Sequence, residues 1–330
     1  MEKLFQKISF TSATLVLVLL LGIFTTLFLS AKPAIDEFGF NFITDKRWNQ
    51  EVPLTQTQTD SQADAVVEED NTQSDVDDED DMIADEDDMI LDEDDEDSQA
   101  ATKTVYGGLV PIVGTLLSTI IALAFALPVA MGIAVFLAEI APKKIATFVG
   151  GAIELLAAIP SIIFGMWGLY YFAPIIAEAF GGYQVSLLTA GLVLGVMILP
   201  FMAAVTRDSM NTTPDVLKES AYALGATKFE VVKDVIFPYS KVGIIGSIIL
   251  ALGRALGETM AVAFLIGAVY SLPEKITDPT ISIPVAMAVN FGEASGLGES
   301  ALFYLGLILF ILSFAIISFA KFYFLKRVKS

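Results

Sequence analysis

Apolar residues form long runs along the chain, and polar residues interrupt these runs at only a few places. A charge-free run at residues 9–31 can cross a hydrocarbon core of roughly 30 Å at about 1.5 Å per helical residue. Further apolar runs fall within residues 108–140, 145–177, 185–205, 242–270 and 301–325. The pattern therefore predicts an all-α membrane protein with six transmembrane helices. A cleaved signal peptide is the alternative for the first run, which is longer than the apolar region of most such peptides.

One long polar interval, residues 207–241, separates the fourth and fifth apolar runs. Thr213, followed by a proline and an aspartate, is typical of the start of a helix. Apolar residues then recur with the spacing of one helix face, at Leu217, Ala221 and Leu224. Gly225 stands where a left-handed residue can end the helix. The first part of the interval therefore predicts a short amphipathic helix.

A second short helix is predicted directly afterwards. Thr227 and Glu230 have the T-x-x-E spacing of a capping box, in which two side chains satisfy the first free amides of a helix. We expect this helix to end near Pro238, because proline has no amide hydrogen with which to continue it. The interval is either a capped connector between two membrane helices or a docking element that lies in a partner's groove.

The distribution of basic residues predicts the orientation in the membrane. With six crossings, most of the 19 Lys and Arg residues fall on the side of both termini, as the positive-inside rule requires for the cytoplasm. The others are Lys32, Lys46, Arg47, Lys103 and Lys275 on the opposite side, and Arg254 within the membrane. We therefore expect a multi-pass protein with both termini and residues 207–241 in the cytoplasm.

Composition excludes several kinds of chemistry. The 330 residues include no cysteine and no histidine, so disulfides, thiolate nucleophiles and histidine ligands are excluded. A G-x-x-x-x-G-K-[ST] phosphate loop is also missing from the sequence, so any ATP hydrolysis must come from another subunit. We therefore expect no catalytic residue, no metal site and no cofactor.

An acidic insert, residues 60–97, holds more than half of the 39 Asp and Glu residues and accounts for the net charge of −20. Three tandem seven-residue copies begin at Asp78, Asp85 and Asp92. Repulsion and low apolar content predict that the insert is disordered. Calcium binding is the alternative, because carboxylates suit that ion, but the glycine of an EF-hand loop is missing.

The expected organisation has three parts. Residues 1–31 form a cytoplasmic N-terminus and the first helix, and residues 32–104 form an extracytoplasmic loop that contains the acidic insert. Residues 105–330 form a core of five helices with the cytoplasmic loop at 207–241.

Charged residues within the apolar runs are the candidates for function, because a charge at a helix centre costs about 2.5–3.5 kcal/mol. Arg254 and Glu258, in LGRALGETMAV, are four residues apart and can pair on one helix face. Alternatively, this face lines a translocation path. Arg254 then offers donors to an oxyanion, and Glu258 holds the cation until the substrate competes.

The third run contains a second carboxylate, Glu154. It can pair with Arg254 across the bundle, or it can lie nearer the cytoplasmic face. Pro160 interrupts the same run and Ser161 can satisfy a freed carbonyl group, so we expect a kink beside the path.

Two sets of motifs resemble those of a known family. The spacing of the EAA loop of ABC importer permeases is kept by Glu219, Ser220, Ala221, Gly225 and Pro238. Conservative departures occur at Ser220, Val235 and Phe237. ELLAAIPSIIFGMWG from Glu154, LGRALGETMAV from Leu252, and FGFNFITDKRW ahead of YGGLVPIVGTL resemble PstC-type permeases of bacterial phosphate ABC importers. The resemblance covers nearly all of residues 1–58 and 103–330, and the acidic insert departs from it.

This resemblance implies the type I ABC importer permease (MetI-like) fold, inorganic phosphate as the substrate, and a prokaryotic cytoplasmic (inner) membrane. It also implies that Arg254 and Glu258 take part in phosphate movement and that the EAA-like loop couples to an ATPase. The implied partners are a homologous PstA-type permease, a dimer of a PstB-type ATPase subunit and an extracytoplasmic PstS-type phosphate-binding protein.

Three alternatives remain open from the sequence. The same fold can carry another oxyanion, such as sulfate or molybdate. An ATP-independent carrier or channel can use Arg254 and Glu258 as a gate or proton relay. A membrane anchor whose acidic segment buffers cations would lose its effect when residues 60–97 are deleted, whereas an importer would keep its uptake.

Overall fold

The computed structural model describes residues 2–53 and 102–328, so the acidic insert predicted at residues 60–97 lies outside the described part. The chain divides into two compact units, one of residues 1–48 and 106–330 and the other of residues 49–105. Most of the described chain is helical, which confirms the predicted all-α class.

The first unit contains α-helices and three π-helical segments, labelled η. In chain order they are α1 (Glu2–Phe38), α2 (Asn41–Thr44), α3 (Leu109–Val135), η1 (Phe136–Ile140), α4 (Lys143–Ala157), α5 (Ser161–Trp167), η2 (Gly168–Phe172), α6 (Ala173–Phe180), α7 (Leu187–Asn211), α8 (Asp215–Ala223), α9 (Lys228–Glu230), η3 (Val231–Ile236), α10 (Phe237–Leu256), α11 (Met260–Ala263), α12 (Ile283–Asn290) and α13 (Leu297–Val328).

The described residues of the second unit lie in a pair of strands, which the sequence did not predict. β1 (Trp48–Pro53) and β2 (Thr102–Tyr106) form a two-stranded sheet. Residues 54–101 come between the two strands in the sequence.

Six of the described helical stretches are long and apolar enough to cross a membrane, as predicted. They are Leu4–Phe38, Leu109–Ile140, Ser161–Phe180, Leu187–Asn211, Lys228–Leu256 and Leu297–Phe322. The first, fourth and sixth extend beyond the ranges expected from the sequence. The third and fifth differ from expectation in where they begin and end.

The third run is broken rather than kinked. α4 ends at Ala157, and α5 begins at Ser161 after Pro160, whose backbone is extended (φ −56°, ψ 137°). Proline restricts the residue before it to extended conformations and cannot donate the next helical hydrogen bond. The membrane-length helix therefore starts at Ser161, and Glu154 lies on the separate helix α4.

The predicted helix end near Pro238 is wrong. The π-helical segment η3 comes directly before α10, and Pro238 is the second residue of that helix. Pro174 has the same position in α6, directly after η2. The wider hydrogen-bonding pattern of a π-turn accommodates a residue without an amide hydrogen, so the helix continues through the proline.

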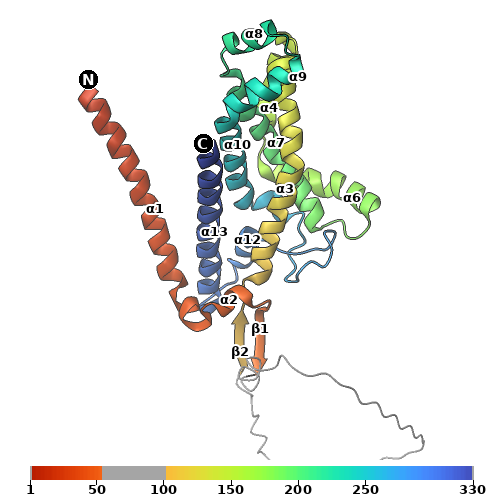
Figure 1. Cartoon of the computed structure of the whole chain (residues 1–330). Coiled ribbons are helices and arrows are strands. Elements are labelled where there is room, and N and C mark those ends of the chain that lie inside the picture. Colours follow the sequence, from red (N-terminus) through yellow and green to blue (C-terminus); the bar gives the residue numbers. More distant parts are fainter. Residues whose placement is uncertain (1, 54–101, 329–330) are drawn as a thin grey trace, which may run out of the picture. The chain divides into compact units, whose positions relative to one another are not determined.

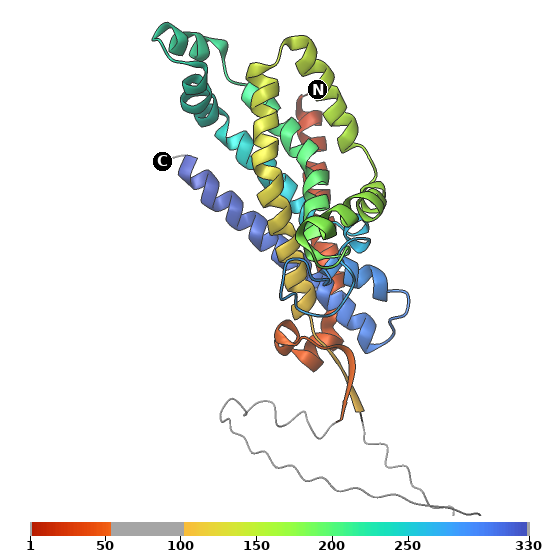
Figure 2. The same ribbon diagram turned by 90° about the vertical axis from the view of Figure 1, so that its right-hand side faces the viewer.

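The core of the first unit is built around α7. This helix packs along α3 and against α10, and α10 also packs against α13 (Figure 1, Figure 2). Glycines allow the closest approach, because a Cβ at Gly195 of α7 would lie 2.9 Å from the Phe125 ring and 3.0 Å from the Ala122 carbonyl of α3. α1 packs on α13 and presents its apolar side chains outward along most of its length.

Candidate functional site

The polar interval after α7 forms two short helices joined at a glycine, as the sequence predicts. Gly225 has a φ of +90°, and the capping box is present, with the Thr227 amide donating to Glu230 Oε2 at 2.7 Å. The expected cap at Thr213 is wrong, because α8 begins at Asp215 without a side-chain cap. Thr213 Oγ1 is buried and has no hydrogen-bond partner among the described residues. Arg207 still belongs to α7, so the loop is shorter than expected.

The apolar residues of this loop are largely exposed. Val216 and Leu217 of α8, Leu224 at its end and Phe229 of α9 all present large side chains to the outside. Two members of the predicted stripe, Leu217 and Leu224, therefore point outward, whereas Ala221 packs against the protein. Lys218 also faces the protein, so the outer face of α8 is free to meet another molecule.

The EAA-like residues lie around this outer face. Glu219 and Ser220 are exposed on α8, and the Ser220 hydroxyl donates to the Val216 carbonyl oxygen at 2.7 Å. Gly225 forms the elbow, and a Cβ there would meet no atom within 4 Å. Pro238 is exposed at the start of α10, beyond η3.

Lys218 attaches α8 to the end of α3. Its Nζ lies 2.6 Å from Glu139 Oε1 on η1, and the side chains are only 15% and 10% exposed. A small apolar cluster surrounds this contact and joins α3, α7 and the loop, with Ala134, Met210, Val231, Val232 and Ile236 buried in it. The residues around Glu139 do not indicate its partner, which lies 79 positions away in the sequence.

Arg254 lies in the last turn of α10 and is exposed. Within the described part of the chain, its guanidinium makes no hydrogen bond or ion pair. α10 ends at Leu256, with Gly257 as its C-cap, so Glu258 lies beyond the helix. The prediction that Arg254 and Glu258 share one face of a continuous helix is therefore wrong.

Glu258 is used locally in the structure. Its Oε1 accepts a hydrogen bond from the amide of Ala261 at 3.3 Å, at the start of the short helix α11. No ion pair joins it to Arg254 in the described structure. The two groups lie on either side of a break in the helix, which is where membrane transporters place backbone groups and charges that contact their substrates.

Glu154 contacts Arg207, whereas the sequence leaves open a pair with Arg254. Its Oε1 lies 3.1 Å from Nη2 of Arg207, near the end of α7, and Arg207 also contacts Asp208 at 2.9 Å. Gly150 makes room, because a Cβ there would collide with the Arg207 guanidinium. Pairing with Arg254 is therefore wrong for this structure, and Glu154 holds α4 against the end of α7. Ser161 is the first residue of α5, after the break.

The segment after Glu258 returns into the protein without forming a long helix. Leu265, Ile266 and Ile281 are fully buried in it. Its carbonyl groups accept hydrogen bonds from the chain before α7, as in Ser186 N to Leu265 O at 2.8 Å. Irregular backbone within a membrane protein needs such internal partners, and here they come from the start of α7 and the stretch before it.

An aromatic cluster lies at the other end of this segment. Trp48, 8% exposed, stacks on Tyr270 with ring centroids 5.1 Å apart and meets Tyr106 edge-on at 5.3 Å. Phe42 stacks on Tyr304 at 4.5 Å. The Trp48 ring is therefore enclosed by protein. Burial raises the pKa of the Tyr270 phenol, and a hydrogen bond from Asn290 offsets part of the rise.

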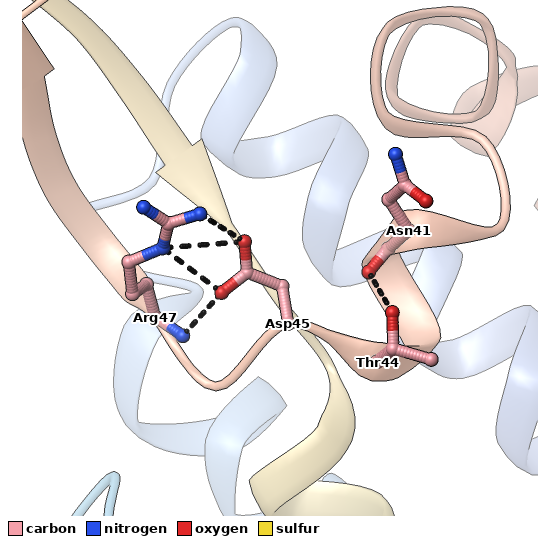
Figure 3. A network of polar contacts seen from close by, with 4 residues as sticks. All are labelled: Asn41, Thr44, Asp45 and Arg47. Carbon is pink, nitrogen blue, oxygen red and sulfur yellow. Dashed lines mark hydrogen bonds and ion pairs between the residues drawn. The ribbon is translucent and has the colours of Figure 1, made fainter. Parts of the chain in front are cut away.

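The turn before Trp48 is held by a charged pair (Figure 3). Arg47 donates to both carboxylate oxygens of Asp45, with Nη2 to Oδ2 at 2.8 Å, and Thr44 Oγ1 donates to the Asn41 carbonyl oxygen at 3.1 Å. Burial alone raises the pKa of Asp45, but the hydrogen bonds and positive charge of Arg47 outweigh it and leave this pKa below its ordinary value. Gly107 is needed beside Asp45, because a Cβ there would collide with the Asp45 backbone.

Comparison with known proteins gives consistent matches. The family of binding-protein-dependent transport system inner membrane components matches residues 109–330. The phosphate transport system permease protein PstC of Pasteurella multocida is 50% identical over 66% of this chain and 74% of that protein. PstC of Mesorhizobium japonicum is 36% identical over 99% of this chain and 90% of that protein.

A solved structure gives the same fold. A chain of the MetNI methionine ABC transporter, in an inward-facing crystal structure, has a TM-score of 0.50 and 22% sequence identity. The match covers 65% of this chain and 91% of that chain. The predicted MetI-like permease fold is therefore confirmed.

Proposed function

Because this chain belongs to the family of binding-protein-dependent transport system inner membrane components, we propose that it is the PstC-type permease subunit of an ATP-driven importer of inorganic phosphate. The observation that carries the proposal is the 36% identity to a phosphate transport system permease over 99% of this chain. That match includes both the EAA-like loop and the stretch around Arg254.

Arg254 is the proposed phosphate contact. Its guanidinium has no partner among the described residues, and its planar fork of donors suits the oxygens of a phosphate. A cation in an apolar helix is costly, so an arginine kept there without a partner indicates a role that requires its charge. Glu258 then takes over the guanidinium when phosphate leaves, and in the described state its carboxylate caps α11 instead.

Glu154 and Ser161 belong to the proposed path through the break between α4 and α5. Glu154 fixes α4 through Arg207, and Ser161 opens the membrane-length helix that follows. These residues shape the path next to α7, and Arg254 contacts the anion.

Coupling to ATP is assigned to the loop after α7. The coupling loop of Glu219, Ser220, Ala221 and Gly225 docks on a PstB-type ATPase subunit through its exposed face, while Ala221 packs against the protein. The chain itself has no phosphate loop with which to hydrolyse ATP. A PstA-type permease and an extracytoplasmic PstS-type phosphate-binding protein complete the proposed importer. Both termini and this loop lie in the cytoplasm, and the loop predicted at residues 32–104 is extracytoplasmic, as the distribution of Lys and Arg favours.

The experiment is uptake of labelled phosphate by the complete importer with Arg254→Gln. We expect uptake to fall about tenfold to a hundredfold, since a hydrogen bond to a charged group contributes about 1.5–3 kcal/mol. Copurification with the ATPase subunit should be unchanged. Lys144→Gln, an exposed charge on α4, is the matched control and should transport normally.

Two further outcomes separate the alternatives. Sulfate or molybdate that competes more strongly than unlabelled phosphate would indicate another oxyanion as the substrate. Uptake that persists when the ATPase subunit is inactivated would indicate a carrier or channel. Full uptake by Arg254→Gln would remove Arg254 from the mechanism.

A further inference from the structure

The ion pair between Lys218 and Glu139 differs from the other ion pairs in the described structure. Both of its side chains are largely withdrawn from solvent, at 15% and 10% exposure. Each of the other pairs described above has one partner that is at least 41% exposed. An exposed pair contributes little because water screens it. Removing Lys218 would leave the enclosed Glu139 carboxylate without a partner among the described residues, and removing Glu139 would leave Lys218 only the exposed Asp215 carboxylate, 4.0 Å away.

The pair joins two elements with different tasks in the proposed importer. Lys218 is the residue directly before Glu219, so it lies at the start of the EAA-like motif on α8. Glu139 lies on η1, which continues α3 without a break. No residue of α8 is fully buried, so α8 is attached to the protein largely through Lys218 and the half-buried Ala221.

α3 extends from this contact to the opposite end of the first unit (Figure 1). There, Thr115 Oγ1 accepts a hydrogen bond from the amide of Ile283 at 2.8 Å, and Gly114 lies so close to the Ile281 carbonyl that a Cβ would collide with it. Ile281 lies near the end of the largely irregular segment that begins at Glu258, and Ile283 is the first residue of α12. A movement of α3 therefore reaches the segment next to the proposed phosphate contact.

The π-helical form of η1 gives this end of α3 an irregular hydrogen-bonding pattern. The amide of Ala141 donates to the Phe136 carbonyl oxygen at 2.8 Å, five residues earlier, instead of the usual four. Single π-turns within long helices occur often at functional positions. Glu139, whose carboxylate contacts Lys218 of α8, lies in the π-turn that follows α3.

We propose that the Lys218–Glu139 ion pair is the joint through which α8 moves α3, so that ATP hydrolysis by the docked ATPase drives transport. Lys218 and Glu139 are positioning residues, because neither contacts phosphate or ATP. The proposal rests on the proposed function, since it needs an ATPase on α8. In this proposal the movement of α8 reaches α3 through the ion pair, in addition to reaching α7 and α10 through the chain itself.

The test measures phosphate uptake and ATP hydrolysis in the same proteoliposomes that contain the complete importer. Glu139→Gln and Lys218→Met should lower the phosphate transported per ATP about fivefold or more, which is the lower end of the usual coupling between two sites. ATP hydrolysis itself should remain close to the wild-type rate. The exchanged pair, Glu139→Lys with Lys218→Glu, should restore most of the transport per ATP.

Matched controls separate loss of the joint from loss of a charge. Glu178→Gln on α6 and Lys144→Met on α4 remove exposed charges and should leave the ratio unchanged. The joint is refuted if Glu139→Gln and Lys218→Met leave the phosphate transported per ATP at the wild-type value. This includes the case in which uptake and ATP hydrolysis fall in proportion, which would make the pair only a structural brace.

A second measurement does not depend on the substrate. The chain has no cysteine, so spin labels can be attached at introduced cysteines alone, at Val129→Cys on α3 and Val216→Cys on α8. With an intact joint, the distance between the labels should stay the same with and without ATP. In the Glu139→Gln background it should change. A distance that changes equally in both proteins would overturn the joint, whereas a wild-type importer without phosphate uptake would contradict only the proposed substrate.

Discussion

Trp48→Ala tests whether the aromatic cluster anchors the turn after α1 to the rest of the first unit. Trp48 is 8% exposed and contacts two rings, Tyr270 at 5.1 Å with parallel planes and Tyr106 at 5.3 Å edge-on. Truncating a buried tryptophan costs about 3–5 kcal/mol, because the apolar surface is lost and a cavity remains. The two ring contacts account for about 1–3 kcal/mol of that cost.

The matched control is Trp167→Ala. Trp167 is 41% exposed and stacks on Phe172 at 5.5 Å, so one ring contact and little burial are lost. We expect this variant to lose only about 1 kcal/mol. Trp48→Phe keeps a ring in the cluster and should lie between the two alanine variants.

The assay is thermal unfolding in detergent, followed by far-ultraviolet circular dichroism. The chain has 2 tryptophans, so a Trp167→Phe background leaves Trp48 as the sole indole, and its emission reports opening of the cluster. We expect the melting temperature of Trp48→Ala to fall well below that of Trp167→Ala. Equal melting temperatures for these two variants would refute the anchoring role.

Two further predictions concern Gly225 and Asp45. Gly225→Ala should weaken binding of the ATPase subunit by a factor of about 5–30, because a φ of +90° costs a residue with a Cβ about 1–2 kcal/mol. The control is Gly246→Ala on α10, where an added Cβ likewise meets no atom within 4 Å, and this variant should bind the ATPase subunit normally. Equal binding by both variants in a pull-down assay would contradict the strained elbow. The pKa of Asp45 is lowered on folding, so its pair with Arg47 stabilises the protein above the unfolded pKa near 3.8, and this contribution is lost as the pH falls through the lower folded pKa. Melting temperatures measured from pH 6 down to pH 3 should therefore fall less in Asp45→Asn than in the wild type, and parallel curves would contradict this assignment.

The sequence predicts those features that depend on neighbouring residues. The capping box of Thr227 and Glu230 and the left-handed Gly225 are confirmed, because both are decided within one helical turn. The apolar runs likewise predict six spans, since length and composition are sufficient for that prediction.

Helix ends that depend on packing against the rest of the protein are harder to predict from the sequence than those set by neighbouring residues. Pro238 was expected to end a helix, but η3 widens the turn before it and Ile236 is buried in the cluster below, so packing supports the continuation. The opposite error occurred at Gly257, where an apolar run continues but the helix ends. A glycine in such a run does not by itself distinguish close packing from a break.

Partners of charged groups could not be predicted, because they come from distant parts of the chain. Glu154 pairs with Arg207, 53 positions away, and Glu139 pairs with Lys218, 79 positions away. The sequence does indicate that carboxylates within apolar runs need a cation. It does not indicate which cation. That Arg254 has no partner in the described ranges 2–53 and 102–328 is visible only after the other cations have been placed.

The pairing of β1 with β2 has a consequence for how this protein can evolve. Because β1 and β2 pair with each other, repeats can be gained or lost in the sequence between them while the two strands stay joined. The tandem copies at Asp78, Asp85 and Asp92 therefore occupy a place where replication slippage changes the length of the protein without shifting the register of a single transmembrane helix.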